Sequence, residues 1–318
     1  MKLFRLNKTN LNEVEQIPFK LERDIQNLVE VNTESVFNLK FIQSELSVDK
    51  YRIDTLCFDE ENNSFVIVEY KKGNSYSVID QGYTYLQLLL NNKSDFLLVL
   101  SQHFNKVLRM EDVDWSQSRI IFVSPSFNSY QKDSVNFKDL PFELWEIKRY
   151  SNDTVVLNQH RSNSKESIET LNPNTTDSTI SQVSREVKVY SEEEHLSKMN
   201  KNILDKWIEL QEELTDLGSV DFIPKRHYIG LNLNGTNICY LKFRKSHILI
   251  DILGGTVYDD KTQSKNFLTL EDPKKITSER SRDLNSGGNQ ISYRITFDSS
   301  SDLDYVMFLI RQKYKQLS

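Results

Sequence analysis

Acidic and basic side chains fall in two neighbouring strand-like segments of the sequence. Asp54 lies within RIDTLCF, which is otherwise suited to burial, and Glu69 and Lys71 lie at the end of FVIVEYKK. The i, i+2 spacing puts Glu69 and Lys71 on one face of a strand and Tyr70 on the other. If the two strands pair as a hairpin, Asp54 approaches Glu69, and two such carboxylates repel unless a cation lies between them. Because hard divalent cations such as Mg²⁺ prefer oxygen ligands, the pattern indicates a metal site.

Two predicted helices add polar side chains around these strands. On a helical wheel Glu22 lies close to Val29, at the margin of an apolar stripe, which directs its carboxylate toward the sheet. Gln81 and Tyr85 lie four residues apart on the helix after the Lys71 strand, so they share a face beside the end of that strand.

Taken in chain order, these residues and the elements that carry them resemble the PD-(D/E)XK nuclease superfamily. The resemblance is greatest to the branch that holds archaeal-type mismatch or branched-DNA endonucleases and restriction-like enzymes. The resemblance covers about residues 15–125, and Ile53 stands where the signature has proline. It implies an α/β restriction-endonuclease-like domain, with a mixed central sheet flanked by helices, that hydrolyses DNA in restriction, phage defence or repair.

The resemblance also implies a role for each residue. Asp54, Glu69 and the backbone carbonyl of Tyr70 would hold Mg²⁺ or Mn²⁺, with Glu22 helping directly or through water. Lys71 would orient and activate the attacking water. The implied substrate contacts are Gln81, Tyr85 and Lys72, and the first two would alternatively brace Lys71.

Plain structural interpretations stand beside these roles. Glu69 and Lys71 would form a solvated pair on an amphipathic strand, Glu22 would be a surface glutamate, and Gln81 and Tyr85 would only pack. Asp54 is harder to explain in this way, because burying an unpaired carboxylate is costly.

The overall charge counts against easy binding of nucleic acid. The chain carries a formal net charge of −6, and residues 1–157 contain 18 Lys+Arg against 23 Asp+Glu. Nonspecific DNA binders usually carry a basic surplus, although carboxylates that hold a cation account for part of the deficit. The alternative function is therefore a nuclease fold that binds nucleic acid or assembles with partners without turnover.

The spacing of apolar residues predicts the elements that position these side chains. A helix begins near Pro18, a hairpin turn covers residues 60–63, and another helix follows Gly73. Strands are predicted over residues 36–42, 51–58, 64–71, 96–100, 119–124 and, at an edge, 142–150.

The second half of the chain has a different composition. Residues 158–185 are rich in Ser, Thr and Asn, which predicts a linker between a nuclease-like domain (1–157) and a smaller α+β domain (186–318). The latter should contain a helix over 191–217, an antiparallel sheet from residue 227 to 297 and a closing helix over 302–314. It is similar to a C-terminal domain of unassigned function found behind nuclease-like modules. No catalytic set is visible in it, so a binding or dimerisation role is expected.

Other features bear on the compartment and on partners. No apolar run approaches the ~20 residues of a membrane span, and MKLFRLNKTN does not have the form of a secretory signal. Cys57 and Cys239 are interpreted as buried thiols of a reducing compartment, and scattered histidines argue against zinc. We expect a cytoplasmic protein whose partners are DNA, a second copy of the chain, or a protein that supplies targeting.

Overall fold

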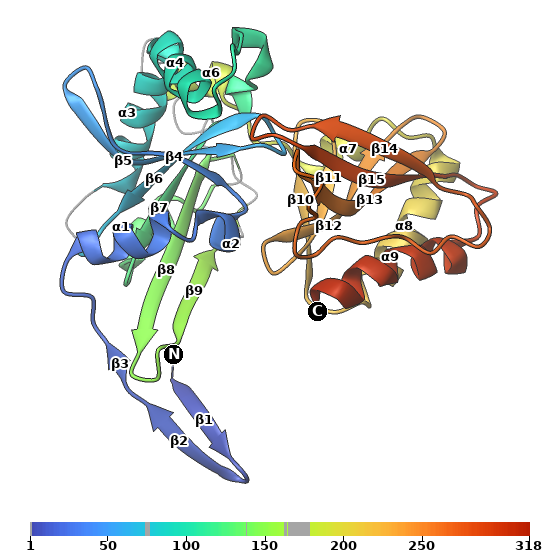
Figure 1. Ribbon diagram of the computed structural model, residues 1–318, viewed down its shortest axis with the longest axis horizontal. Helices are drawn as coiled ribbons and strands as arrows, with labels where there is room; N and C mark the ends of the chain where they lie inside the picture. Colours follow the sequence, from blue (N-terminus) through green and yellow to red (C-terminus); the bar gives the residue numbers. More distant parts are fainter. Residues whose placement is uncertain (1, 74–76, 138, 162–163, 165–178) are drawn as a thin grey trace. The chain divides into compact units, whose positions relative to one another are not determined.

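The computed structural model describes residues 2–73, 77–137, 139–161, 164 and 179–318 (Figure 1). The chain divides into two compact units, Met1–Val189 and Tyr190–Ser318. Each unit has its own hydrophobic core.

The first unit is built on a mixed sheet, as predicted. Its strands follow the order β3-β8-β7-β6-β5-β4, and β9 pairs with β8. β4, β5 and β6 are antiparallel, whereas β6, β7 and β8 run parallel. The bounds are β3 (Gln16–Ile17), β4 (Lys40–Val48), β5 (Tyr51–Asp59), β6 (Ser64–Tyr70), β7 (Arg119–Ser124), β8 (Phe142–Tyr150) and β9 (Val155–His160).

Helices cover both faces of this sheet (Figure 1). One face holds α1 (Glu22–Glu30) and α2 (Thr33–Phe37), and the other holds α3 (Val78–Asn91), α4 (Lys93–Phe104) and α6 (Thr179–Glu186). Within β6, Val66 and Val68 join the core on the α1 side, while Phe65 and Ile67 join the core on the α3 side. Double coverage explains why the segment is continuously apolar until Glu69.

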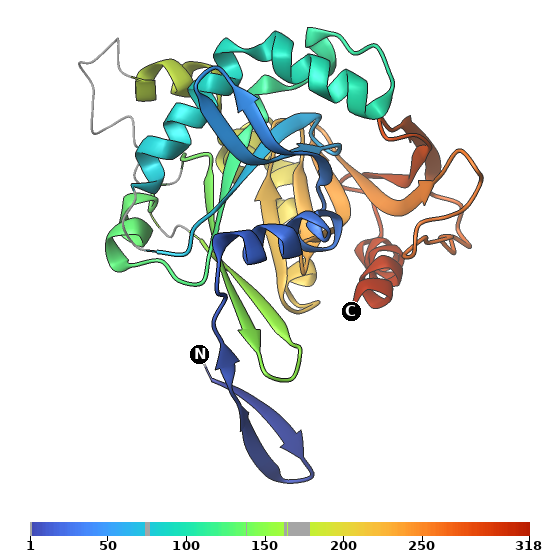
Figure 2. The same cartoon turned by 60° about the vertical axis from the view of Figure 1, so that its left-hand side comes forward.

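The remaining elements of the first unit are short. β1 (Leu3–Asn7) and β2 (Asn10–Val14) form a separate hairpin that projects away from the sheet in both views (Figures 1 and 2). Two 3₁₀ turns, Met110–Asp112 and Trp115–Gln117, and α5 (Ser129–Ser134) lie in the connections around β7.

Three predicted strands of this unit require correction. The segment from Phe96 to Leu100 is helical, because it lies within α4, and these two residues, four apart, face the core. A short apolar run does not by itself separate a strand from a buried helix. The segment 36–42 contains the end of α2 and the start of β4, separated by Asn38 in the left-handed conformation. β8 is not an edge strand, because it pairs with β7 and β9.

The predicted linker is also wrong at both ends. Its first residues complete β9, and its last residues form α6, which packs on α3. Val183 and Val187, four residues apart, are buried in the core on the α3 side, and Lys93 Nζ pairs with Glu186 at 2.5 Å. The first unit therefore extends to Val189 rather than to Leu157. Residues 162–163 and 165–178, the middle of the predicted linker, lie outside the described residues.

The second unit is a small α+β domain whose sheet is fully antiparallel, as predicted. The strand order is β10-β11-β12-β13-β15-β14. The strands are β10 (Val220–Pro224), β11 (Ile229–Leu233), β12 (Thr236–Phe243), β13 (Ile248–Val257), β14 (Ser278–Asp283) and β15 (Asn289–Phe297). The helices are α7 (Glu192–Leu196), α8 (Lys201–Thr215) and α9 (Leu303–Leu317).

The helix predicted over 191–217 is interrupted. α8 starts anew after Asn200, whose side chain accepts a hydrogen bond from the Ile203 N–H and so caps the helix. Trp207 of α8 is 1% exposed and packs edge-on against Phe243, with ring centroids 5.0 Å apart. The buried residues of α8 (Ile203, Trp207, Leu210 and Leu214) therefore complete the local core, and Trp207 is not available for a subunit contact. In the described part of the chain, no helix has the length and apolar character needed to cross a membrane.

Candidate metal and nuclease site

Strand register brings the two predicted acids together at the open end of the β5–β6 hairpin. Thr55 pairs with Val68, so Asp54 falls opposite Glu69. The hairpin turn over residues 60–63 lies at the far end of the same two strands, as predicted. Lys71 continues β6, and its backbone N–H donates to Val123 O on β7 at 2.9 Å.

A connected set of hydrogen bonds surrounds Glu69. Lys71 Nζ and Gln81 Nε2 both donate to Glu69 Oε1, each at 2.7 Å. Gln81 Nε2 also donates to the Tyr85 hydroxyl at 3.1 Å, and that hydroxyl donates to Arg52 O at 3.2 Å. On the adjacent strand, Asp54 Oδ2 accepts the Tyr70 N–H at 3.0 Å. The structure thus brings Asp54, Glu69, Lys71, Gln81 and Tyr85 into one site.

Burial shifts both carboxyl groups toward their protonated forms. Burial, followed by the nearby Asp54 carboxylate, raises the pKa of Glu69 to about 7, against the opposing effects of Lys71 and Gln81. The pKa of Asp54 is also raised, first by burial, while the Tyr70 N–H and Lys71 oppose the shift. Two carboxyl groups that resist joint ionisation form a pair that a cation would stabilise.

One oxygen atom of the pair lacks a protein partner among the described residues. Glu69 Oε2 is buried and accepts no hydrogen bond there, although Oε1 of the same carboxylate accepts two. A buried polar atom left in this state costs free energy. A hard cation bound to Glu69 Oε2 and to Asp54 would remove that cost, so the donor set fits Mg²⁺ or Mn²⁺.

The number of protein ligands is small. Among the described residues, no group of three or more His, Cys, Asp or Glu side chains is arranged to hold a metal ion. Two carboxylates plus the Tyr70 carbonyl are nevertheless compatible with Mg²⁺, which keeps several waters and commonly binds through one or two carboxylates.

Glu22 and Lys72 lie beside the site rather than within it. Glu22 is exposed at the start of α1, and its Oε1 accepts the Lys72 N–H at 2.8 Å. Its charge is close enough to contribute to the raised pKa of Asp54. Lys72 is exposed, and its Nζ donates to the Lys20 carbonyl. Glu22 therefore connects α1 to the end of β6. This position suits a contact with a bound metal ion through a water molecule better than direct coordination of the metal by Glu22.

A further acid, Glu45, was missed by the sequence analysis. On β4, Ser44 pairs with Thr55 and Leu46 with Ile53, so Glu45 falls opposite Asp54. Glu45 has a φ of 53°, and its Oε2 accepts Arg52 Nε at 2.8 Å. Its charge contributes to the raised pKa of Asp54. No local signal in the sequence indicates this left-handed glutamate, because its position depends on the pairing of β4 with β5.

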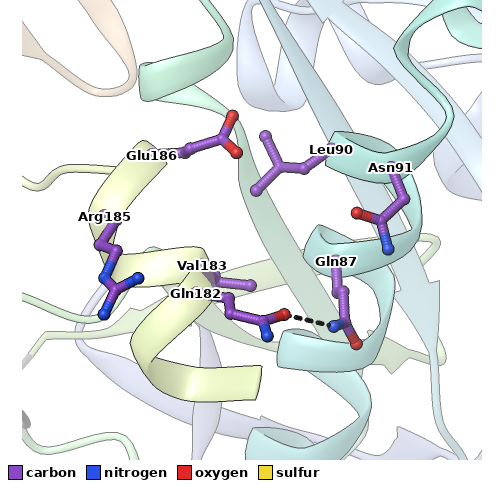
Figure 3. A pocket seen from close by; sticks show the side chains of 7 residues that line it. All are labelled: Gln87, Leu90, Asn91, Gln182, Val183, Arg185 and Glu186. Carbon is purple, nitrogen blue, oxygen red and sulfur yellow. Dashed lines mark hydrogen bonds between the residues drawn. The ribbon is translucent and has the colours of Figure 1, made fainter. Parts of the chain in front are cut away.

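A separate open hollow lies between α3 and α6 (Figure 3). Its volume is about 410 Å³, and a hydrogen bond of 3.0 Å from Gln87 Nε2 to Gln182 Oε1 crosses one side. Its lining comes from the later turns of α3, beyond Gln81 and Tyr85, and from α6. None of the proposed site residues lines it.

Comparison with known proteins finds relatives for the whole chain and for its parts. An uncharacterized protein of Haemophilus influenzae (strain ATCC 51907 / DSM 11121 / KW20 / Rd) is 37% identical over 326 residues, which cover 99% of this chain and all of that protein. Residues 192–316 match a domain of unknown function, DUF5655. This match covers nearly all of the second unit.

Two solved structures show a partial and distant likeness. A repair endonuclease from Pyrococcus abyssi is 18% identical over 38% of this chain and 45% of its own, with a TM-score of 0.21. The structure of an EndoMS–dsDNA complex is 19% identical over 45% of this chain and 50% of its own, with a TM-score of 0.22. At these scores the assignment of the site depends on its own geometry.

Proposed function

The chain belongs to the same family as the uncharacterized Haemophilus influenzae protein, and we propose that its first unit is a metal-dependent nuclease that hydrolyses phosphodiester bonds in DNA. The observation that carries this proposal is the buried Glu69 Oε2, which accepts no hydrogen bond from the described residues and lies on the strand next to Asp54. Lys71 Nζ, 2.7 Å from the other oxygen of the same carboxylate, places a cation beside the pair.

Each residue has a distinct role in the proposed reaction. Asp54, Glu69 and the Tyr70 carbonyl would hold Mg²⁺ or Mn²⁺. A bound divalent cation lowers the pKa of water and stabilises charge on the transferring phosphoryl group. Lys71 orients the attacking water and offsets the negative charge that develops on the phosphate.

Gln81 and Tyr85 act mainly by positioning. Gln81 Nε2 holds Glu69 Oε1 at 2.7 Å, and the Tyr85 hydroxyl links Gln81 to the backbone of β5. This brace fixes the orientation of the Glu69 carboxylate and leaves Oε2 as the oxygen directed to the cation.

Cleavage assays with matched variants test the proposal. The full chain is incubated with plasmid, linear duplex and single-stranded DNA in Mg²⁺, Mn²⁺ or EDTA. Asp54→Asn and Glu69→Gln should each abolish metal-dependent cleavage, while Glu111→Gln, whose side chain is 70% exposed, should cleave like the unaltered chain. Cleavage that survives in either site variant would overturn the assignment.

A second candidate is a nuclease fold that binds nucleic acid without turnover. The observation in its favour is the absence, within the described part of the chain, of a third acid arranged with Asp54 and Glu69 to hold a metal. Metal-independent binding of DNA, with no cleavage of any of the three substrates, would favour this candidate.

A further inference from the structure

A second charged cluster surrounds Glu146 on β8. Glu146 Oε1 lies 3.0 Å from Lys132 Nζ of α5 and 3.0 Å from His160 Nε2 of β9, and Oε2 lies 3.4 Å from Lys148 Nζ. The Phe127 N–H also donates to Oε1, at 3.4 Å. Burial would raise the pKa of Glu146, but the nearby Lys132 and His160 side chains outweigh it and lower the pKa to about 2. This carboxylate is therefore charged throughout the physiological range.

The cluster lies in the same row of the sheet as Lys71. Tyr70 pairs with Val123, so the next residue, Lys71, lies opposite Ser124 of β7. Ser124 in turn pairs with Glu146 of β8. Neighbouring strands are spaced by about 4.8 Å, which puts Lys71 and Glu146 roughly 10 Å apart along the edge where β6 and β7 end.

The cluster also faces the same side of the sheet as the candidate metal site. Glu146 lies two residues beyond Leu144, which belongs to the core on the α3 side, and Glu69 receives a hydrogen bond from Gln81 of α3. Alternation along a strand therefore puts both carboxylates on the α3 side. The side chains of Lys132 and Lys148 are 36% and 21% exposed, so a ligand can reach them. The His160 side chain is 26% exposed, and its Nε2 atom is buried against Glu146.

The charge balance of the cluster favours an anion. Two lysines around one carboxylate leave a surplus of one positive charge even when His160 is neutral. In a chain with a net charge of −6, this is a local reversal of sign beside the proposed catalytic lysine. Such basic groups supply most of the sequence-independent affinity for nucleic acid.

We propose that Lys132, Lys148 and His160 form a subsite that binds a backbone phosphate of the same nucleic-acid strand whose scissile phosphate lies at Lys71. This subsite rests on the proposed nuclease function, because it would bind the same substrate as the candidate metal site. A separation of roughly 10 Å puts this phosphate within a few nucleotides of the point of cleavage. Glu146 is a positioning residue, since it holds the three cationic side chains together. A contact of this kind sets register and orientation without reading sequence.

Binding measured without turnover tests the subsite. The full chain is titrated with a fluorescently labelled duplex and a labelled single strand in EDTA, over a series of salt concentrations. The double variant Lys132→Gln/Lys148→Gln should lose about tenfold in affinity, and the slope of log K against log salt should fall by about 1. Lys188→Gln is the matched control: this lysine is exposed, and its N–H donates to Ser116 O, before β7 begins and therefore at the opposite end of that strand.

A second variant should raise the affinity for DNA, whereas the double variant lowers it. Glu146→Gln keeps a side-chain oxygen that can accept hydrogen bonds from the cationic groups but removes the negative charge of the cluster, so affinity for DNA in EDTA should rise. A purely structural ion cluster would instead give unchanged or weaker binding. Either a double variant that binds like Lys188→Gln, or unchanged or weaker binding by a Glu146→Gln protein with unchanged melting temperature, would overturn the subsite.

The two proposals fail in distinguishable ways. If no substrate is cleaved in Mg²⁺ or Mn²⁺ but the double variant still loses affinity, the subsite stands and the catalytic assignment falls. If the unaltered chain cleaves DNA and the double variant binds and cleaves like Lys188→Gln, the nuclease stands and the subsite falls.

Discussion

At the scale of single residues, the raised pKa of Glu69 links metal binding to pH. A metal ion must displace the proton of a carboxyl group whose pKa lies at about 7, so affinity for Mn²⁺ should fall as the pH is lowered from 8 to 6. Calorimetric titration with Mn²⁺ measures this change. Equal affinity at both pH values would show that Glu69 is not a ligand.

The raised pKa of Glu69 also predicts how the stability of the metal-free protein depends on pH. Because the pKa of Glu69 is raised from its ordinary value of 4.5, its contribution to stability is fully present below pH 4.5 and is lost as the pH rises through about 7. Glu69→Gln should therefore stabilise the metal-free protein at pH 8, by at most about 3 kcal/mol, and have little effect at pH 5. Thermal melts in EDTA at both values, with Glu111→Gln as control, measure the difference. A destabilised Glu69→Gln protein at pH 8 would contradict the shift.

Lys71 and its neighbour Lys72 form a matched pair for kinetics. The proposed role of Lys71 is exercised mainly in the transition state, so Lys71→Gln should reduce kcat by at least about 100-fold and change affinity in EDTA little. Lys72 is exposed, and its Nζ contacts the Lys20 carbonyl, so Lys72→Gln should have a mild effect. Equal losses of rate and affinity in Lys71→Gln would make it an ordinary phosphate contact.

At the scale of elements, α6 should contribute to the stability of the first unit. Val183 and Val187 are buried against the core on the α3 side, whereas Val189 is 40% exposed. Val183→Ala and Val187→Ala should each lower the free energy of unfolding of this unit by roughly 1–3 kcal/mol, and Val189→Ala by much less. Urea denaturation measures these changes. If all three variants unfold alike, α6 does not pack on the unit in solution.

At the scale of the whole molecule, we expect the first unit to carry the catalytic residues and the second unit to provide binding contacts. The candidate acids, Lys71, Gln81 and Tyr85 all lie in Met1–Val189, and Tyr190–Ser318 has its own core. We expect a fragment of residues 1–189 to retain metal-dependent nicking, and a fragment of residues 190–318 to fold without activity. Loss of activity in a folded 1–189 fragment would show that the second unit completes the site.

The boundary chosen for that fragment matters. A cut after Leu157 would remove part of β9 and all of α6, and with them His160 and two buried valines of the first unit.

Sedimentation of the full chain and of the 1–189 fragment tests the expected dimer. Because Trp207 is buried within its own unit, self-association would not involve this side chain.

The sequence by itself determined what depends on local order. The alternation in β6 puts Glu69 and Lys71 on one face, and the four-residue spacing puts Gln81 and Tyr85 on one face of a helix, as the structure shows. The hairpin that sets Asp54 opposite Glu69 follows from two strands and a short turn. These features involve residues close along the chain, where side-chain direction follows from backbone periodicity alone.

Only the tertiary structure decided what depends on pairing and packing between distant segments. Glu45 reaches Asp54 because β4 pairs with β5, and the Glu146 cluster joins three separate elements beside Lys71. The segment from Phe96 to Leu100 became a helix, and the end of the predicted linker became α6, because buried partners on the α3 side were available to both. Such choices depend on surfaces contributed by remote parts of the chain, which a local pattern of apolar and polar residues does not specify.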